Sequence, residues 1–225
     1  MKTIIITGIA KGLGYSMYSL LSKTRCYIVG IDKESMNNNN ETLATINNLT
    51  MNLSEESLDL SKINNILPDQ TEEIIFINNA GIIKPIGKVG TIQDLSIVEA
   101  TFVNFISPMR IANIIKSKAM KLGVHMRIIN ISTGAANKPF PGWSMYCSTK
   151  CGIKMFFDCI DREDESIIVH HIDPGVMDTG MQQLIRDASF EQFPLRDKFV
   201  EYKSKNLLQK PEDVARNILT KEGLL

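Results

Sequence analysis

The chain has 225 residues, of which 44% are hydrophobic, and its 25 lysines and arginines balance its 25 aspartates and glutamates. A chain of this length and composition can bury the core of one α/β domain. The balanced charge gives no strong field toward nucleic acid or an anionic membrane, so we expect neither as a partner. No apolar run approaches the roughly 18 residues that span a bilayer, and the N-terminus lacks the pattern of a secretory signal.

The cysteines and histidines give no sign of a disulfide framework or a metal site. The four cysteines are sparse and lack the paired spacing of metal ligands. Three of them, Cys147, Cys151 and Cys159, fall in one predicted helix, where we expect small buried side chains. The three histidines form no ligand set with them, so no metal is predicted. The expected setting is the reducing cytoplasm.

A strand, a glycine turn and a helix open the chain. The β-branched run at residues 3–7 is typical of a strand buried on both faces, and a helical pattern follows at residues 15–23. Glycines in the turn let the backbone approach a pyrophosphate, and the helix N-terminus supplies free N–H groups and partial positive charge. This order predicts a dinucleotide cradle. Its expected residues are Thr7, Gly8, Ala10, Lys11, Gly12, Leu13 and Gly14.

A second apolar strand, at residues 26–31, ends at Asp32, eighteen residues after Gly14. A carboxylate at this point is placed to hold the adenosine ribose hydroxyls, although capping of a loop is an alternative role. Lys11 and Lys33 are both available to a 2′-phosphate. Because the carboxylate repels that phosphate, the sequence slightly favours NAD and leaves NADP open.

The middle of the chain continues the alternation of strands and helices. We expect a polar loop around a short helix at residues 35–48, a third strand at 49–53, and a helix that begins near Ser54. A fourth strand, at 73–77, ends in small residues that leave room for a ligand at the carboxyl edge of a sheet. Those residues are Asn78, Asn79, Ala80 and Gly81.

Polar side chains then stand at three further points. Asn104 lies in a long helical pattern at residues 93–122, where a buried amide must be hydrogen-bonded, either in a site or in a helix contact. A fifth strand, at 126–132, ends at Ser132 and Thr133. Tyr146 and Lys150 are four apart on a helix and share one face, where an ammonium lowers the pKa of a phenol. Alone, such a pair more often covers a surface.

The last third of the chain holds a sixth strand, at 166–172, which ends at Asp173-Pro174-Gly175. Residues 176–209 look irregular and form a candidate substrate lid, and Pro211 opens a final helix. The alternation over residues 1–225 predicts one α/β domain, a Rossmann-like doubly wound parallel sheet with helices on both faces.

The motifs, taken together and in order, resemble the short-chain dehydrogenase/reductase family over nearly the whole chain. They are the glycine turn after Thr7, Asn78-Asn79-Ala80-Gly81, Asn104, the Ser132-Thr133 pair, Tyr146-x-x-x-Lys150 and Pro174-Gly175. Residues 132–150 and 174–182 look like the branch of sepiapterin and benzil reductases. The resemblance implies an NAD(P)-dependent enzyme that reduces a small carbonyl substrate, most simply an aromatic ketone or dicarbonyl.

The resemblance also implies residue roles. Tyr146 is then the general acid, Lys150 lowers its pKa and binds the nicotinamide ribose, and Asn104 holds a water in a proton relay. The usual serine, thirteen residues before the tyrosine, is replaced by Thr133, with Ser132 as the fallback. Further cofactor contacts are implied for Asn79, Ala80 and Gly81 at the adenosine ribose, Asn52 and Leu53 (or Asp59) at the adenine, and Pro174, Gly175, Val176 and Thr179 near the nicotinamide.

An apolar substrate pocket is expected from Phe140, Trp143, Met177 and Met181, although the two aromatic residues also suit a core. Gly180 stands where sepiapterin reductases carry the acid that anchors a pterin, which argues against that substrate. The seventh strand of many relatives is absent or vestigial, so we expect six strands. A homodimer is compatible with this, whereas the usual tetramer has no support.

Two other functions are compatible with parts of the pattern. A cofactor-binding sensor without turnover is favoured by the change from serine to Thr133 and disfavoured by the intact Tyr146 and Lys150. Enoyl reduction is disfavoured because family members with that activity show a longer spacing between the tyrosine and the lysine.

Overall fold

The computed structural model describes residues 1–36 and 42–225. Within them, six parallel strands form one sheet in the order β3-β2-β1-β4-β5-β6. The strands are β1 (Lys2–Thr7), β2 (Tyr27–Asp32), β3 (Thr45–Thr50), β4 (Glu73–Asn78), β5 (His125–Ile131) and β6 (Ile167–Ile172). The predicted Rossmann-like sheet of six strands is confirmed.

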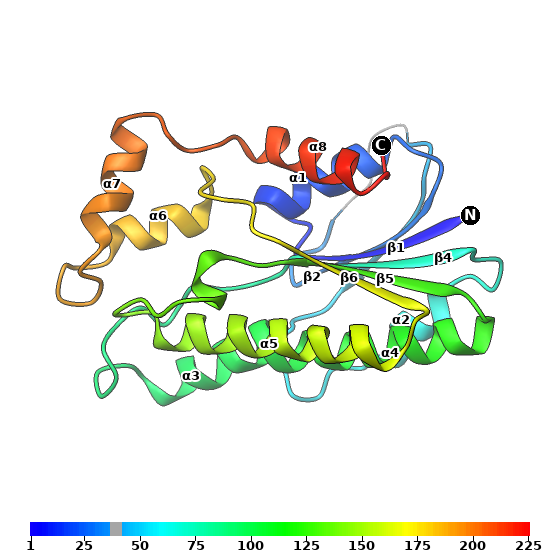
Figure 1. Ribbon diagram of the computed structural model, residues 1–225, viewed down its shortest axis with the longest axis horizontal. Helices are drawn as coiled ribbons and strands as arrows, with labels where there is room; N and C mark the ends of the chain where they lie inside the picture. The colour runs from blue at the N-terminus through cyan, green and yellow to red at the C-terminus, as the bar shows by residue number, and fades with distance from the viewer. Residues whose placement is uncertain (37–41) are drawn as a thin grey trace.

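Helices cover both faces of the sheet (Figure 1). One face carries α1 (Gly12–Leu21) and α8 (Pro211–Lys221), and the other carries α3 (Asp94–Thr101), α4 (Ser107–Leu122) and α5 (Ser144–Glu163). The central strands are apolar on both sides because each side faces helices: Ile4 and Ile6 pack toward α1 and α8, whereas Ile5 packs toward α4 and α5. Because all six strands are parallel, their carboxyl ends meet at one edge of the sheet, between the two faces that the helices cover.

The third strand and the next helix differ from the sequence prediction. Strand β3 covers Thr45–Thr50, earlier than the expected 49–53, and α2 begins at Ser61 and ends at Ile66 instead of beginning near Ser54. As an edge strand, β3 tolerates polar side chains, and Asn47 donates to the Tyr27 hydroxyl at 2.6 Å. The short helix expected at 35–48 falls partly on residues 37–41, which lie outside the described residues.

The helix predicted at 93–122 is continuous but contains a wider turn. Between α3 and α4, residues Phe102–Ile106 form a π-helical turn, and the Ser107 amide donates to the Phe102 carbonyl, five residues back. Pro108 follows, and its missing N–H leaves the α-helical ladder incomplete at this point. The turn places Asn104 in the interior, where it is 2% exposed.

The segment at 176–209, predicted to be irregular, holds two helices. They are α6 (Gly180–Asp187) and α7 (Arg196–Ser204). Figure 1 shows both on the left, beyond the carboxyl ends of the strands. Helix α6 buries Gln182 and Ile185 on one side, so the apolar pattern is too short and too polar to have been recognised in the sequence.

The remaining expectations concern the cysteines, membrane-spanning helices and groups of metal ligands. Cys151 and Cys159 are exposed on α5 and are not the buried hydrophobes expected, since they lie on the helix face opposite the sheet. In the described part of the chain, no helix is long and apolar enough to cross a membrane. Among the same residues, no group of three histidine, cysteine or acidic side chains is arranged to hold a metal.

Candidate active site

Tyr146 lies in the first turn of α5, at the carboxyl edge of the sheet, and is 8% exposed. Its hydroxyl is hydrogen-bonded to the side chain of Thr133, which follows the end of β5. Ser132 instead uses its backbone amide to donate to the Ile172 carbonyl at 2.7 Å, joining β5 to β6. Of the two candidate hydroxyls, the structure therefore brings that of Thr133 to the tyrosine.

The pKa of Tyr146 moves opposite to the expected direction. Burial raises it from 10.0 to about 12, while the hydrogen bond from Thr133 acts to lower it and the charge of Asp173 acts to raise it further. Lys150 is not among the groups that shift it in this structure, so acidification of the phenol by the lysine stays a prediction. The phenol sits among apolar side chains and stays protonated at neutral pH, as a proton donor must be.

Lys150 is buried one helical turn beyond Tyr146, with 5% exposure. Its ammonium donates to the Ile131 carbonyl at 3.0 Å, and burial lowers its pKa to about 8. A methyl group added at Gly81 would lie 3.6 Å from the Lys150 Nζ atom and 3.3 Å from the Asn104 Oδ1 atom. The side chains of Lys150 and Asn104 therefore both lie beside Gly81, just after the end of β4.

Asn104 makes three hydrogen bonds. Its Oδ1 atom accepts from the Ile82 amide at 2.8 Å, and its Nδ2 atom donates to the Ile82 carbonyl at 2.8 Å and to the Thr149 hydroxyl at 3.3 Å. Both amide hydrogens are thus used within the protein. The residue fixes the chain that leaves β4 against α5, and its oxygen keeps a second lone pair on the side that faces Gly81.

The glycine turn is locked by contacts across the sheet. The Thr7 hydroxyl is buried and accepts from the amides of Asn79 and Ala80 at 3.1 and 3.0 Å. The side-chain amide of Asn79 donates to the backbone carbonyls of Thr7 and Gly8 at 2.9 and 3.2 Å. A side chain at Gly14 would come within 1.9 Å of the Gly8 carbonyl oxygen, so the helix packs directly on the turn.

The N-terminus of α1 is suited to an anion. Lys11, which precedes the helix, provides no side-chain cap, so the first N–H groups, of Gly12, Leu13 and Gly14, are left to other acceptors. The Leu13 side chain itself packs in the core. Gly12 has φ +60, and a methyl group there would lie 3.5 Å from the Thr179 side chain. These features fit the pyrophosphate of a dinucleotide, held between the turn and the start of α6.

Asp32 lies at the end of β2, next to the turn. Its carboxylate accepts from the Ala10 amide at 2.9 Å and the Glu34 amide at 3.1 Å, so it orders the loop that follows β2 and the turn that follows β1. Lys11 is paired with Glu34 at 3.2 Å on the surface, whereas Lys33 reaches a separate pocket. The two candidate lysines therefore stand in different surroundings.

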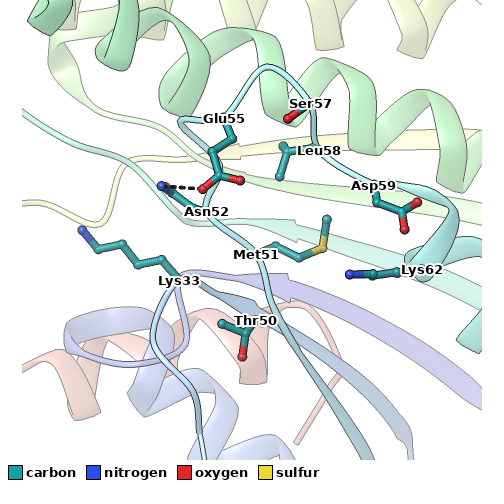
Figure 2. A pocket seen from close by; sticks show the side chains of 9 residues that line it. All are labelled: Lys33, Thr50, Met51, Asn52, Glu55, Ser57, Leu58, Asp59 and Lys62. Atoms are coloured by element: carbon teal, nitrogen blue, oxygen red, sulfur yellow. Dashed lines mark hydrogen bonds between the residues drawn. The ribbon is translucent and has the colours of Figure 1, made fainter.

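That pocket has a volume of about 360 Å³ and lies beyond the ends of β2 and β3 (Figure 2). It is lined by Lys33, Asn52 and Asp59 among others, so both alternatives for an adenine contact line the same space. Asn52 is held by Glu55 at 3.2 Å and by the Ser54 hydroxyl at 2.9 Å. Leu53 points instead into the core, which makes its predicted cofactor contact wrong for the side chain.

The segment after β6 is clamped by a residue that sequence reasoning missed. Gln209 donates its side-chain amide to the Pro174 carbonyl at 3.3 Å and its backbone amide to the Val176 carbonyl at 3.0 Å. Gly175 has φ +73 there, and any side chain would strike Gln209 at 2.6 Å. Gln209 lies 34 residues further on, at the end of the candidate lid, and no local pattern marks it.

An aromatic cluster covers Tyr146 on the lid side. Trp143 is stacked on Phe193 with ring centroids 4.4 Å apart, and its ring meets Tyr146 edge-on at 5.8 Å. Phe140 and Met181 pack on the same cluster, whereas Met177 packs against the core beneath α1 and α8. Met177 is drawn away because its backbone pairs with Gln209 in a short parallel bridge.

Trp143 and Gly142 join α5 to the segment at 176–209. The Trp143 indole N–H is buried without a hydrogen-bond partner, the one such side-chain atom found in the described residues. Gly142 has φ +86, and a side chain there would lie 2.2 Å from the Gln192 carbonyl oxygen. This close approach requires a glycine and allows Phe193 to close over Trp143.

Comparison with known proteins agrees with this geometry. The family model described as short chain dehydrogenase matches residues 2–189. Benzil reductase ((S)-benzoin forming) of Bacillus cereus is 31% identical over 240 residues, which cover 99% of this chain and 95% of that protein. Sepiapterin reductase of Bos taurus is 30% identical over 156 residues, which cover 68% of this chain and 58% of that protein.

Among solved structures, the crystal structure of the KRED1-Pglu enzyme superposes with a TM-score of 0.81 at 19% identity, and covers 96% of this chain and 92% of its own. That structural similarity supports the fold, and the sequence similarity supports the assignment to a family. The chain belongs to the short-chain dehydrogenase/reductase family and is an NAD(P)-dependent oxidoreductase.

Proposed function

We propose that the chain reduces a small aromatic ketone or dicarbonyl, with Tyr146 as the general acid. The observation that carries the proposal is the buried Tyr146 hydroxyl, hydrogen-bonded to Thr133 inside an apolar cluster. A phenol with a pKa of about 12 holds its proton until an alkoxide forms beside it, so the site is better suited to reduction than to alcohol oxidation at neutral pH.

The bound nicotinamide dinucleotide supplies the hydride in this reaction. Tyr146 donates its proton to the carbonyl oxygen as negative charge develops there, and Thr133 holds the same oxygen by a second hydrogen bond. Lys150 keeps a positive charge one turn away, which stabilises the tyrosinate that remains. Asn104, with its free lone pair toward Gly81, is placed for the water of a proton relay.

The proposed substrate follows from the side chains around the tyrosine. Phe140, Trp143, Phe193 and Met181 present apolar and aromatic surface with few polar groups. Such a surface favours aryl groups over sugars or charged metabolites. The benzil reductase of Bacillus cereus acts, by its name, on an aromatic dicarbonyl, which supports the same class here.

For the cofactor, we propose a modest preference for NAD. The Asp32 carboxylate accepts only one amide hydrogen on each oxygen, so lone pairs remain for ribose hydroxyls. The same charge disfavours a 2′-phosphate, which Lys33 partly offsets from the adjoining pocket. The exposed thiols of Cys151 and Cys159 suit a reducing compartment such as the cytoplasm.

The test is the oxidation of NADH and NADPH with benzil, isatin and a panel of related carbonyls, compared between wild type and Tyr146→Phe. We expect a loss of about 10²- to 10⁴-fold in turnover, with cofactor dissociation constants within about twofold, since the phenol moves a proton and contributes little to cofactor binding. Turnover that survives the substitution contradicts the role of Tyr146. Cofactor binding without oxidation of any carbonyl favours the sensor instead.

A further inference from the structure

A carboxylate that the proposed reaction does not use stands at the mouth of the site. Asp173 directly follows β6, and the bond from the Ser132 amide to the Ile172 carbonyl fixes the ends of β5 and β6 side by side. A methyl group added at Gly134 would lie 3.7 Å from the Asp173 Oδ2 atom. Since Gly134 follows Thr133, the carboxylate is one residue away from the hydroxyl that meets Tyr146.

The charge of Asp173 is not balanced by a close cation. Its Oδ1 atom accepts from the Gly175 amide at 3.0 Å, which fixes the side chain, and the residue is exposed. None of the ion pairs found in residues 1–36 and 42–225 includes it. The Lys138 Cε atom lies 4.0 Å from the same position at Gly134, but its ammonium forms no ion pair with Asp173 and lies over the Phe140 ring, 5.4 Å from the centroid. The field of Asp173 does reach the tyrosine, because it contributes to the raised pKa of Tyr146.

We infer that Asp173 sets the charge specificity of the site: it admits neutral carbonyl compounds and rejects those with a carboxylate next to the carbonyl, the 2-oxo acids. This inference rests on the proposed carbonyl reduction. A 2-oxo acid bound with its carbonyl oxygen at Tyr146 and Thr133 has its own carboxylate one bond from the reacting carbon. Its carboxylate then lies close to that of Asp173 at the exposed mouth of the site, where the two like charges repel each other.

The test compares two substrates of the same shape and different charge, phenylglyoxylate and its methyl ester. Asp173→Asn removes the charge and keeps a side-chain oxygen for the Gly175 amide. We expect it to raise kcat/KM for the anion about five- to ten-fold and to leave that for the ester within about twofold. Added salt is expected to narrow the gap between the two substrates in wild type only.

A matched control removes one negative charge elsewhere. Glu165 is exposed just before β6, at the opposite end of the strand from Asp173. Glu165→Gln therefore changes the net charge by the same amount without changing the mouth of the site. It is expected to leave the ratio of the two substrates unchanged. An equal shift in both variants would show a general effect of net charge and overturn the inference.

A second readout does not depend on turnover. Trp143 is the only tryptophan in the chain and packs edge-on against Tyr146, so its fluorescence reports ligands that enter the site. Dissociation constants for mandelate and mandelamide should differ in wild type and converge in Asp173→Asn. If they keep their wild-type ratio, the inference fails. If the ratio changes but no carbonyl is reduced, the proposed reaction fails and the charge specificity stands.

Discussion

The carboxyl edge of the sheet has two halves that differ in how they are built. The reaction half, at the ends of β4, β5 and β6, holds Asn104, Tyr146 and Lys150, all of them buried. The adenosine half, at the ends of β2 and β3, holds Asp32 and Lys33, which are partly or fully exposed around an open pocket. The same sheet edge therefore presents a desolvated site and a hydrated one.

The difference decides what each half can do. In the reaction half, burial raises the pKa of Tyr146 and lowers that of Lys150. A group there that loses its hydrogen-bond partner stays unpaired, because water cannot reach it. In the adenosine half, water screens the charges, so a single side chain changes affinity only modestly. We therefore expect large effects from the first half and small ones from the second.

Lys150→Met should have the largest effect and should separate activity from stability. We expect turnover to fall at least about 100-fold, because the charge beside the tyrosinate is lost. Burial of the ammonium, which moves the pKa of this lysine from 10.5 to about 8, costs on the order of 3 kcal/mol in wild type. The variant removes this cost but leaves the Ile131 carbonyl without its donor, at about 1–3 kcal/mol, so we expect a small net gain in stability at neutral pH. Urea denaturation and steady-state kinetics on the same preparations measure both.

The pH dependence of that stability has a definite sign. The folded pKa is lowered, so the cost of the buried ammonium is present in full below about pH 8 and fades as the pH rises toward 10.5. The gap between wild type and Lys150→Met should therefore narrow over this range. Lys154→Met, on the same helix in a surface pair with Asp158, should show neither the gain nor the pH trend. A destabilised Lys150→Met would contradict this account.

Each half contains a hydrogen-bonded asparagine, and the cost of losing it can be compared directly. Asn104→Ala leaves both the amide and the carbonyl of Ile82 without their partner, so we expect a loss of about 2–4 kcal/mol in the free energy of unfolding. Asn52→Ala removes contacts with Ser54 and Glu55 that water can replace, and should cost less than about 1 kcal/mol. Equal losses, measured by denaturant titration, would erase the distinction between the halves.

Asp32→Ser tests the hydrated half. Without the carboxylate, we expect the ratio of the dissociation constants of NADPH and NADH to shift toward NADPH by about tenfold, a factor that corresponds to about 1.4 kcal/mol. Because the loop also loses two hydrogen bonds to Asp32, Asp32→Asn is the matched control that keeps an acceptor. An unchanged ratio would mean that Asp32 only orders the loop.

Thr133→Ser should have the smallest effect. The hydroxyl is kept and only a methyl group is removed, so we expect turnover within about threefold of wild type. Thr133→Val, which keeps the shape and removes the hydroxyl, should lower turnover at least about tenfold. If the serine variant is much faster, the threonine methyl crowds the site. If the valine variant is unaffected, the hydrogen bond to Tyr146 has no catalytic part.

The sequence predicts the fold well for strands that are buried on both faces. The cores of β1 and β4 are continuous apolar runs, Ile4–Ile6 and Ile74–Ile77, as expected for strands covered on both faces. The edge strand β3 was misplaced, because Asn47 and Asn48 satisfy a half-exposed strand yet look like a loop in sequence. Helices α6 and α7 were missed because each has two or three turns and buries few side chains.

The site was predictable to the extent that its residues occur in ordered motifs. The structure brings Thr133 to Tyr146 and places the side chains of Lys150 and Asn104 beside Gly81, while their roles in a reaction stay predictions. The direction of the tyrosine pKa was not predictable, since it depends on apolar cover contributed by Ile185 and Phe193 from distant segments. Gln209 shows the same limit: its contacts depend on the path of the chain through the lid and not on any local pattern.

The π-helical turn at Phe102–Ile106 has a consequence for how this site can change in evolution. A π turn contains one residue more than an α turn, so it marks the place where a single inserted residue is absorbed. Deleting one residue there would restore α geometry while α3 and α4 keep their phase, so only the residues within the turn would change the face that they present. The contact of Ser107, on α4, with Leu53 could then persist, whereas Asn104 would lose its position opposite Ile82. A change of chain length by one codon can therefore remove this asparagine from the interior without disturbing the helices on either side.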